Sequence, residues 1–413
     1  MTRIGLESPN QAPSVAQTGG HVGPRHPMNG LRILALLHQL SLTGAPRLTV
    51  DILEALQAEA SVRIVSWAGG PLTDAARRLG PTVVLRQDRV GRFLPRGLAT
   101  EHVVEALAGG SARIRAIGQA ARLRSWKPQL VYVSSVSALP LVRMLRLEDV
   151  PIVLHVHELG SALAWFEREY PGLILSVPDQ YAADSAAVAH DLVHQLGVPS
   201  DVVSVVTPYL LPPVLDTPPM SGAIDRTPLI VGGAGNPSWT KGIDLWLLAA
   251  REAVDRLGAD RLRFVWVGYR DNQAGLQFRS MISRLGLDGV VELVPTADRI
   301  HHHFARFDMF AMTSWEDSFP LVVLEAMAMG VPVICFAPTG GPAEEVGEAG
   351  ITIPEISPHR MADAIVDLAQ SPEKRRALGS VSAERARSEF SRAASVAALV
   401  KVFDAATALR GRL

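Results

Sequence analysis

The chain has 413 residues, of which 48% are hydrophobic and 20% charged, as in a globular protein and unlike a disordered or fibrous one. Its formal charge of −1 (40 − 41) excludes the strong positive field of a typical nucleic-acid-binding protein, so we expect no nucleic-acid partner. No stretch reaches the ~18 to 20 apolar residues that span a bilayer. The single cysteine, Cys335, excludes an internal disulfide, and this fits a cytoplasmic location.

The first 28 residues are rich in Pro, Gly, Ser and Gln and lack the apolar centre of a signal peptide. We predict a disordered tail over 1–28, with Met28 as an alternative start. The first strand, LRILALL, follows directly.

From residue 31 onward, short β-rich runs alternate with segments of helical period, which is typical of parallel sheets covered by helices. A Pro-dense stretch at 207–220 interrupts the alternation and predicts a linker. We therefore predict an α/β protein with two Rossmann-like, doubly wound parallel-sheet domains. The predicted boundaries are 29–215 for the first domain, 216–395 for the second and 396–413 for a C-terminal helix that crosses back.

The expected strands of the first domain are RILALL, SVRIVSW, TVVLR, LVYVS, PIVLHVH and LILSV, and those of the second are PLIVGGAG, RFVWVGY, VVELVP, DMFAMT, VPVICFA and GITIP. Ligands of such sheets bind beyond the carboxyl ends of the strands. The cleft between the two domains is therefore the expected active site.

The segment SWEDSFPLVVLEAMAMG, residues 314–330, runs from a loop into a helix whose first turn contains Pro320. The free amides of Phe319, Leu321 and Val322 would point out of the start of this helix. Free amides and the helix dipole together favour an anion, so we expect a diphosphate there.

Two carboxylates belong to the same segment, Asp317 in the loop and Glu325 inside the helix. Carboxylates accept hydrogen bonds from the vicinal hydroxyls of sugar and ribose rings. The alternative is that Asp317 only caps the helix and Glu325 lies on a solvated face.

Lys241 precedes Gly242 at the start of a second predicted helix, after the Gly-rich loop in TPLIVGGAGNPSWTKGIDLWLLAA (227–250). A lysine there opposes the helix dipole unless an anion lies beside it, which favours a bound phosphate over a solvated surface lysine. Neither GxxxxGK[ST] nor a complete GxGxxG occurs, which argues against an ATPase or a dehydrogenase.

The first domain offers a Gly-containing turn, LLHQLSLTGAP, in which Gly44 allows close approach to a ligand or simply forms a tight turn. Its fifth strand ends in His155, His157 and Glu158, with both imidazoles on one side. A His-x-His pair can bind zinc, but no third ligand has convincing spacing, so we predict no metal site and expect polar recognition. The run His301–His303 is an unlikely metal site, because three consecutive residues give poor ligand geometry.

DSFPLVVLE followed by AMAMGVPV resembles the donor site of retaining glycosyltransferases of family 4, which have the two-domain GT-B architecture. The resemblance implies that Glu325 binds the ribose, Asp317 the transferred sugar, and the 319–322 turn the phosphates. It also implies that Lys241 binds the diphosphate, that Gly44 faces it from the other domain, and that His157 faces the sugar.

The chain departs from that family pattern at two positions. Asp317 stands where a Glu is commoner, with Glu316 just before it, and Asn236 stands where an arginine usually completes the cationic pair.

The resemblance implies a cytoplasmic hexosyltransferase of polysaccharide or glycolipid biosynthesis that needs no cofactor or metal. Its partners would be a nucleotide-sugar donor and a glycan, lipid-linked or small-molecule acceptor. The alternatives are a nucleotide-sugar epimerase or hydrolase of the same fold, and a non-catalytic sugar-nucleotide-binding protein.

Residues 77–124 carry ten arginines against three acidic residues, an excess of +7 (10 − 3). This stretch is either a solvated helix face or a peripheral contact with the anionic inner face of the membrane.

Overall fold

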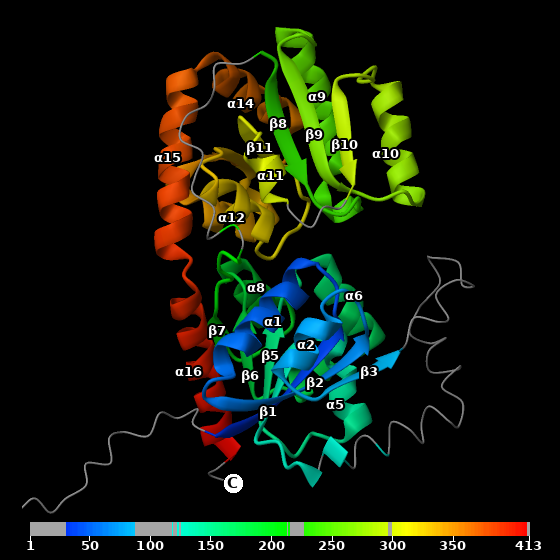
Figure 1. The fold of residues 1–413 in the computed structure, drawn as a ribbon, viewed down its shortest axis with the longest axis vertical. Coiled ribbons are helices and arrows are strands. Elements are labelled where there is room, and N and C mark those ends of the chain that lie inside the picture. The colour runs from blue at the N-terminus through cyan, green and yellow to red at the C-terminus, as the bar shows by residue number, and fades with distance from the viewer. Residues whose placement is uncertain are drawn as a thin grey trace, which may run out of the picture.

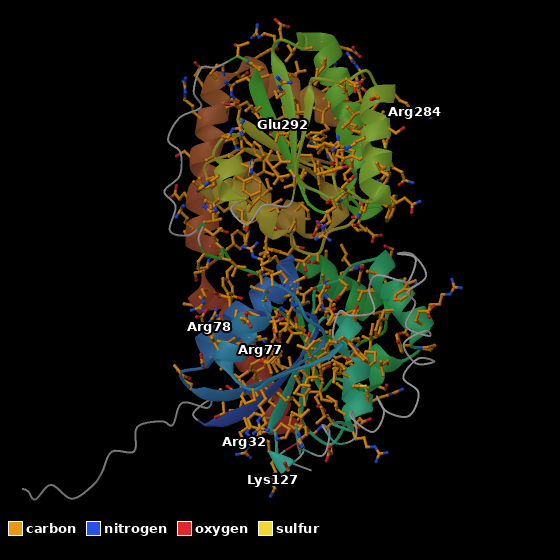
Figure 2. All side chains as sticks on the ribbon, turned by 45° about the vertical axis from the view of Figure 1, so that its right-hand side comes forward. Arg32, Arg77, Arg78, Lys127, Arg284 and Glu292 are labelled. Carbon is orange, nitrogen blue, oxygen red and sulfur yellow. The ribbon has the colours of Figure 1, made fainter. Side chains whose placement is uncertain are left out.

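The computed structural model describes residues 30–86, 118, 122–123, 125–212, 214, 227–295 and 300–410. The predicted tail and most of the arginine-rich stretch lie outside these residues. Of that stretch, Arg77 and Arg78 lie on the flank of the lower half of the molecule in Figure 2.

The first sheet has seven parallel strands in the order β3-β2-β1-β4-β5-β6-β7 and forms the core of the lower lobe in Figure 1. Its strands are β1 (Leu31–Gln39), β2 (Ala60–Ala68), β3 (Thr82–Arg86), β4 (Leu130–Ser134), β5 (Ile152–Val156), β6 (Gln180–Ala183) and β7 (Val203–Val205). The central strands β4 and β5 are buried throughout and mostly apolar because helices cover both faces of the sheet. We call this part the N-terminal lobe.

The second sheet has six parallel strands in the order β10-β9-β8-β11-β12-β13 and forms the core of the upper, C-terminal lobe (Figure 1). Its strands are β8 (Leu229–Ala234), β9 (Leu262–Tyr269), β10 (Val291–Pro295), β11 (Met309–Met312), β12 (Val333–Phe336) and β13 (Ile351–Ile353). In each sheet the strand order reverses next to the first strand, at β1/β4 and at β8/β11. The predicted pair of doubly wound parallel sheets is confirmed.

Helices follow most strands of both sheets. Those of the N-terminal lobe are α1 (Gly44–Leu56), α2 (Thr73–Leu79), η1 (Val136–Ala138), α5 (Pro140–Leu145), α6 (Ser161–Glu169), α7 (Leu173–Ser176), α8 (Ala186–His190), η2 (Asp191–Gln195) and η3 (Ser200–Val202). Those that follow in the chain are η4 (Trp239–Lys241), α9 (Ile243–Leu257), α10 (Gln273–Arg284), α11 (His301–Phe304), α12 (Leu321–Ala328), η5 (Ala337–Thr339), α13 (Gly341–Val346), η6 (Gly347–Ala349), α14 (Pro358–Gln370), α15 (Pro372–Glu389) and α16 (Arg392–Arg410).

One predicted strand is wrong. The run LILSV is not a strand, because Leu173–Ser176 form the short helix α7, in which the Ser176 hydroxyl donates to the Gly172 carbonyl over 2.6 Å. The sheet instead continues through β6 and β7, which the sequence analysis did not predict. A short apolar run fits a buried helix as well as a buried strand, and periodicity alone does not separate the two.

The last two helices connect the lobes. In Figure 1, α15 lies along the C-terminal lobe and α16 continues down the N-terminal lobe. Two arginines attach α16 there, Arg392 to Asp51 at 2.7 Å and Arg410 to Asp179 at 3.0 Å. The C-terminal helix thus crosses back to the first sheet, and it begins at Arg392, before the expected boundary at 396. None of the described helices combines the length and apolarity required to cross a membrane.

Candidate functional site

Two helix N-termini meet where the lobes face each other. α1 begins at Gly44 after β1, and a Cβ on Gly44 would lie 3.6 Å from the Leu321 side chain at the start of α12. Neither helix has a side chain that caps its N-terminus. Their first amides are therefore free to bind an anion, and both helix dipoles favour one.

Glu325 lies inside this interface and not on a solvated face, since only 2% of it is exposed. Its Oε1 accepts a hydrogen bond from Arg47 of α1 over 3.1 Å, and its Oε2 has no hydrogen-bond partner among the described residues. Burial raises the pKa of Glu325, although the Arg47 charge opposes the shift. The second oxygen is thus available to a ligand hydroxyl.

Lys241 and Asp317 form an ion pair at the carboxyl end of the second sheet, with Nζ 2.5 Å from Oδ2. The pairing depends on Gly242, whose φ of +59° suits glycine, and a Cβ there would lie only 1.8 Å from the Thr313 carbonyl oxygen. Any side chain at 242 would push η4 away from the 313–317 loop. The two sequence-predicted residues therefore share one site, although 76 positions separate them.

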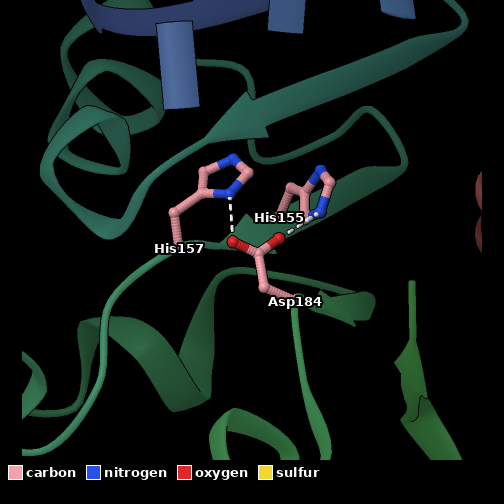
Figure 3. A group of neighbouring side chains, drawn as sticks. All are labelled: His155, His157 and Asp184. Atoms are coloured by element: carbon pink, nitrogen blue, oxygen red, sulfur yellow. Dashed lines mark hydrogen bonds and ion pairs between the residues drawn. The ribbon is translucent and has the colours of Figure 1, made fainter. Parts of the chain in front are cut away.

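The N-terminal lobe contributes a buried cluster at the carboxyl ends of β5 and β6. Figure 3 shows one carboxylate oxygen of Asp184 facing each imidazole: His157 Nδ1 is 2.8 Å from Oδ2, and His155 Nε2 is 3.0 Å from Oδ1. The other ring nitrogens are also occupied, His155 Nδ1 by the Tyr132 hydroxyl at 2.7 Å and His157 Nε2 by the Ser134 hydroxyl at 3.1 Å.

The pKa values of the two histidines are shifted in opposite directions. Burial, together with the charge of His157, lowers the pKa of His155. Burial also acts against a charged His157, but the Asp184 carboxylate outweighs it and raises the pKa of His157. We therefore assign the charge of the cluster to an ion pair between His157 and Asp184, beside a neutral His155.

Asp184 also supplies the third metal-ligating group that the spacing did not reveal, since one ligand atom from each of the three residues lies within 4.8 Å of the others. Each ring nitrogen nevertheless faces a protein group: three of them are hydrogen-bonded, and His155 Nε2 lies 3.0 Å from Asp184 Oδ1 without forming a hydrogen bond. The geometry of the cluster accounts for a fixed His157 without a metal.

Backbone and carboxylate contacts join the two lobes around this cluster. The Ser318 hydroxyl donates to the His157 carbonyl over 2.8 Å. Glu316 accepts from the Ser161 amide at the start of α6 over 2.9 Å, and Glu344 accepts from the Ala186 amide at the start of α8 over 2.9 Å. We call Glu316 and Glu344 the interlobe carboxylates.

Residues 226–371 match the family model described as glycosyl transferases group 1. This part of the chain, which includes most of the C-terminal lobe, is thus similar to that family.

Among curated relatives, a D-inositol 3-phosphate glycosyltransferase of Corynebacterium glutamicum (strain R) is 30% identical over 245 residues. That match covers 56% of this chain and 58% of the relative, so the chain spans little more than half the length of the relative.

Solved structures resemble the whole two-lobed fold. A glycosyltransferase from Rickettsia africae superposes with a TM-score of 0.69 at 15% identity, covering 92% of this chain and 99% of that one. HepE of Anabaena, in complex with UDP-glucose, superposes with a TM-score of 0.66 at 18% identity, covering 93% of this chain and all of that one. The chain thus has a GT-B-like fold.

The structure brings most of the sequence-predicted residues to the interface between the lobes. Lys241 and Asp317 touch each other, and Gly44 faces the start of α12, where Leu321 lies. Phe319 is 5% exposed and packs its ring on Phe390, so only its backbone is offered to a ligand. Val322 and Glu325 lie on α12 itself, and the His157 carbonyl accepts a hydrogen bond from Ser318, just before α12.

Sequence reasoning missed several residues of the site. Arg47 supplies a cation beside Glu325, whereas no arginine stands at 236. Asp184 and Ser134 hold His157 from neighbouring strands. A polar residue at the end of each parallel strand was the available signal for both, but β6 itself was not predicted.

Proposed function

We propose that the chain is a retaining hexosyltransferase that moves a sugar from a nucleoside-diphosphate donor to a hydroxyl of a glycan, lipid-linked or small-molecule acceptor. One observation supports this most. Lys241 forms an ion pair with Asp317 just before α12, whose N-terminus is uncapped and whose first two turns contain Glu325. A cation, free amides and two carboxylates are the groups that a diphosphate joined to two polyhydroxylated rings requires.

Within this proposal the C-terminal lobe binds the donor. The amides at 319–322 and the Lys241 ammonium bind the diphosphate, and the unpartnered Oε2 of Glu325 accepts from a ribose hydroxyl. Arg47 at the start of α1 takes the place of the arginine absent at 236 and approaches the phosphates from the N-terminal lobe. Asp317 accepts from hydroxyls of the transferred sugar, and His157 faces the same sugar from the opposite lobe.

The chemistry follows from where charge develops. When the bond between the sugar C1 and the diphosphate oxygen breaks, its electron pair stays on the diphosphate, where Lys241 and the α12 amides stabilise it. The acceptor oxygen attacks C1 from the face that the diphosphate leaves, and its proton passes to the departing phosphate oxygen. The new bond then has the configuration of the old one, and protein groups neutralise the leaving group without a metal ion.

The test starts with donor binding. A thermal-shift screen of the full chain against uridine, guanosine and adenosine diphosphate sugars identifies the donor, because a bound ligand stabilises the fold by mass action. The complex of HepE with UDP-glucose makes uridine sugars the first choice. NMR of the product then reads the anomeric configuration, with activity measured in excess chelator.

Each rival has its own result in this experiment. An epimerase or hydrolase converts the donor without an acceptor, and a non-catalytic protein binds the donor without turnover. An inverted anomer, or activity that chelator abolishes and Mg²⁺ restores, contradicts the proposed mechanism.

A further inference from the structure

A pocket of about 480 Å³ opens between the lobes beside the proposed donor site. Its walls come from η1 and α6 of the N-terminal lobe and from η4 of the C-terminal lobe. Glu158, which lines it, follows His157 directly, and Trp239, which also lines it, stands two positions before Lys241. Its size falls within the roughly 300 to 1,000 Å³ of small-molecule sites.

Two exposed tryptophans dominate this pocket. Trp165 on α6 is 48% exposed and Trp239 on η4 is 59% exposed, and both line the pocket from opposite lobes. Every other Trp, Tyr and Phe side chain among the described residues is at least partly buried. Exposing two indoles in one place costs solvation free energy, so a shared binding role accounts for them better than chance does.

The Trp239 ring is also held in place. It stacks on Trp315 with the ring centroids 5.8 Å apart and the planes 9° from parallel. Trp315 precedes Glu316 and Asp317, and its amide donates to the Thr240 carbonyl over 2.9 Å. The stacked Trp239 and Trp315 rings are therefore held by the same loop that carries Asp317.

The charge of the pocket limits what it can bind. Among the described residues that line it, Glu158 is the single ionisable group, and no Lys or Arg is present. A phosphorylated acceptor would bring its dianion beside this acidic group with no lysine or arginine in the lining to pair it, which is costly in a partly buried site. The aromatic faces instead match the apolar C–H face of a pyranose ring, and the Ser137 hydroxyl matches one of its hydroxyls.

We propose that this pocket is the acceptor subsite and that it binds an uncharged sugar ring of a glycan between Trp165 and Trp239. The proposal rests on the proposed transferase function and adds to it the chemical class of the acceptor. It differs from the acceptor named in the Corynebacterium relative, which carries a phosphate.

The first experiment measures transfer from the identified donor to uncharged methyl glycosides and disaccharides, and to D-inositol 3-phosphate. We expect transfer to members of the uncharged set and not to the inositol phosphate. Transfer to the inositol phosphate alone overturns the proposal. A second measurement of acceptor binding is quenching of tryptophan fluorescence by the uncharged sugars, with the nucleoside diphosphate present. If no sugar causes saturable quenching, the proposal is also overturned.

The second experiment uses variants. Trp165→Ala and Trp239→Ala should each raise the acceptor KM about 3- to 10-fold, since a lost aromatic contact and its buried area amount to a factor of that order. Leu276→Ala on α10, where Leu276 is 60% exposed outside the pocket, is the control for loss of an exposed apolar side chain. A rise in the donor KM alone would assign the tryptophans to the donor and overturn the proposal.

A charge variant separates the two acceptor classes. Ala162→Arg places a cation in the pocket. It should weaken binding of the uncharged acceptor and increase any transfer to D-inositol 3-phosphate. Ala164→Arg, on the same helix but outside the pocket, is the matched control. If no nucleotide sugar stabilises the wild-type chain, the transferase function fails; if the donor binds but the acceptor is anionic, only this inference fails.

Discussion

Lys241 is held by Asp317 with a quarter of its side chain exposed. In the proposed function, the donor diphosphate carries more charge than one carboxylate, so it should compete for the ammonium and leave Asp317 to accept from a sugar hydroxyl. The ion pair thus holds both groups in position for the proposed donor.

Lys241→Ala should lower kcat/KM by about 10²-fold, because it removes a charge-assisted contact that strengthens as the leaving diphosphate gains charge. The measurement is steady-state transfer kinetics with the identified donor. Lys374→Ala is the matched control, since Lys374 also pairs with an aspartate, at 2.6 Å from Asp367, but on the surface. Turnover at the wild-type rate in Lys241→Ala would remove this lysine from the site.

Glu345 on α13 is fully buried, and neither of its carboxyl oxygens has a hydrogen-bond partner among the described residues. Burial, together with the negative charge of Asp317, raises its pKa well above the usual value of 4.5. The folded chain therefore binds a proton at Glu345 that the unfolded chain has released. The stabilisation is complete below pH 4.5 and is lost as the pH rises through the raised pKa.

Glu345→Gln should remove this pH dependence, because the amide keeps the shape of the neutral acid and cannot ionise. We expect the free energy of unfolding of Glu345→Gln, relative to wild type, to increase as the pH rises from about 4.5, and urea denaturation at a series of pH values measures it. Glu348→Gln, an exposed change three positions further on, controls for the loss of a carboxylate. A difference that stays constant with pH would mean that Glu345 is ionised in the folded protein.

At the scale of elements, the sequence predicted the long and strongly patterned pieces and failed on short ones. Strands such as β1 and β9 have eight or nine residues and clear turn residues around them. LILSV has the composition of a strand, yet Gly172 starts it in the left-handed region and it forms α7. β7 has three residues, two of them exposed, so no hydrophobic pattern marks it.

α16 shows how an element can belong to a lobe that is distant in sequence. Phe403 is fully buried, and its ring meets Tyr132 of β4 edge to face at 5.3 Å. The Tyr132 hydroxyl in turn forms a hydrogen bond with His155 Nδ1. The helix α16 therefore packs directly behind the histidine cluster.

Phe403→Ala should lower the free energy of unfolding by about 3 to 5 kcal/mol, since it leaves a cavity in a close-packed core. Chemical denaturation measures the loss. Leu409→Ala on the same helix is the control, because Leu409 is 47% exposed and its truncation leaves no cavity. A loss below about 1 kcal/mol for Phe403→Ala would mean that α16 is only loosely attached.

For the whole molecule, the sequence was sufficient to predict two lobes and the C-terminal-lobe segments that lie at the interface between them. It could not predict which residues meet across that interface. Arg47 and Glu325 are 278 positions apart, and Ser161 and Glu316 are 155 apart. Such pairs depend on how two finished lobes dock, and no local periodicity or spacing records this.

The interlobe carboxylates contribute to how firmly the lobes dock. Glu316 accepts hydrogen bonds from both the amide and the hydroxyl of Ser161, and Glu344 accepts from the amides of Ala186 and Ala187. Each carboxylate thus caps the N-terminus of a helix of the other lobe. It also lies at the positive end of the dipole of that helix. An N-cap contributes about 0.5 to 2 kcal/mol, so the two together hold the lobes with about 1 to 4 kcal/mol.

The double variant Glu316→Ala/Glu344→Ala should therefore shift the protein towards conformations with the lobes further apart, while each lobe keeps its own core. Small-angle X-ray scattering should show a larger radius of gyration than for wild type. The donor KM should rise as well, because Arg47 and Gly44 on α1 then face α12 for a smaller fraction of the time. Glu348→Ala/Glu373→Ala removes two exposed carboxylates from the same lobe and is the control. Unchanged scattering and an unchanged donor KM in the Glu316/Glu344 variant would mean that α16 and the Arg47–Glu325 pair hold the lobes without these caps.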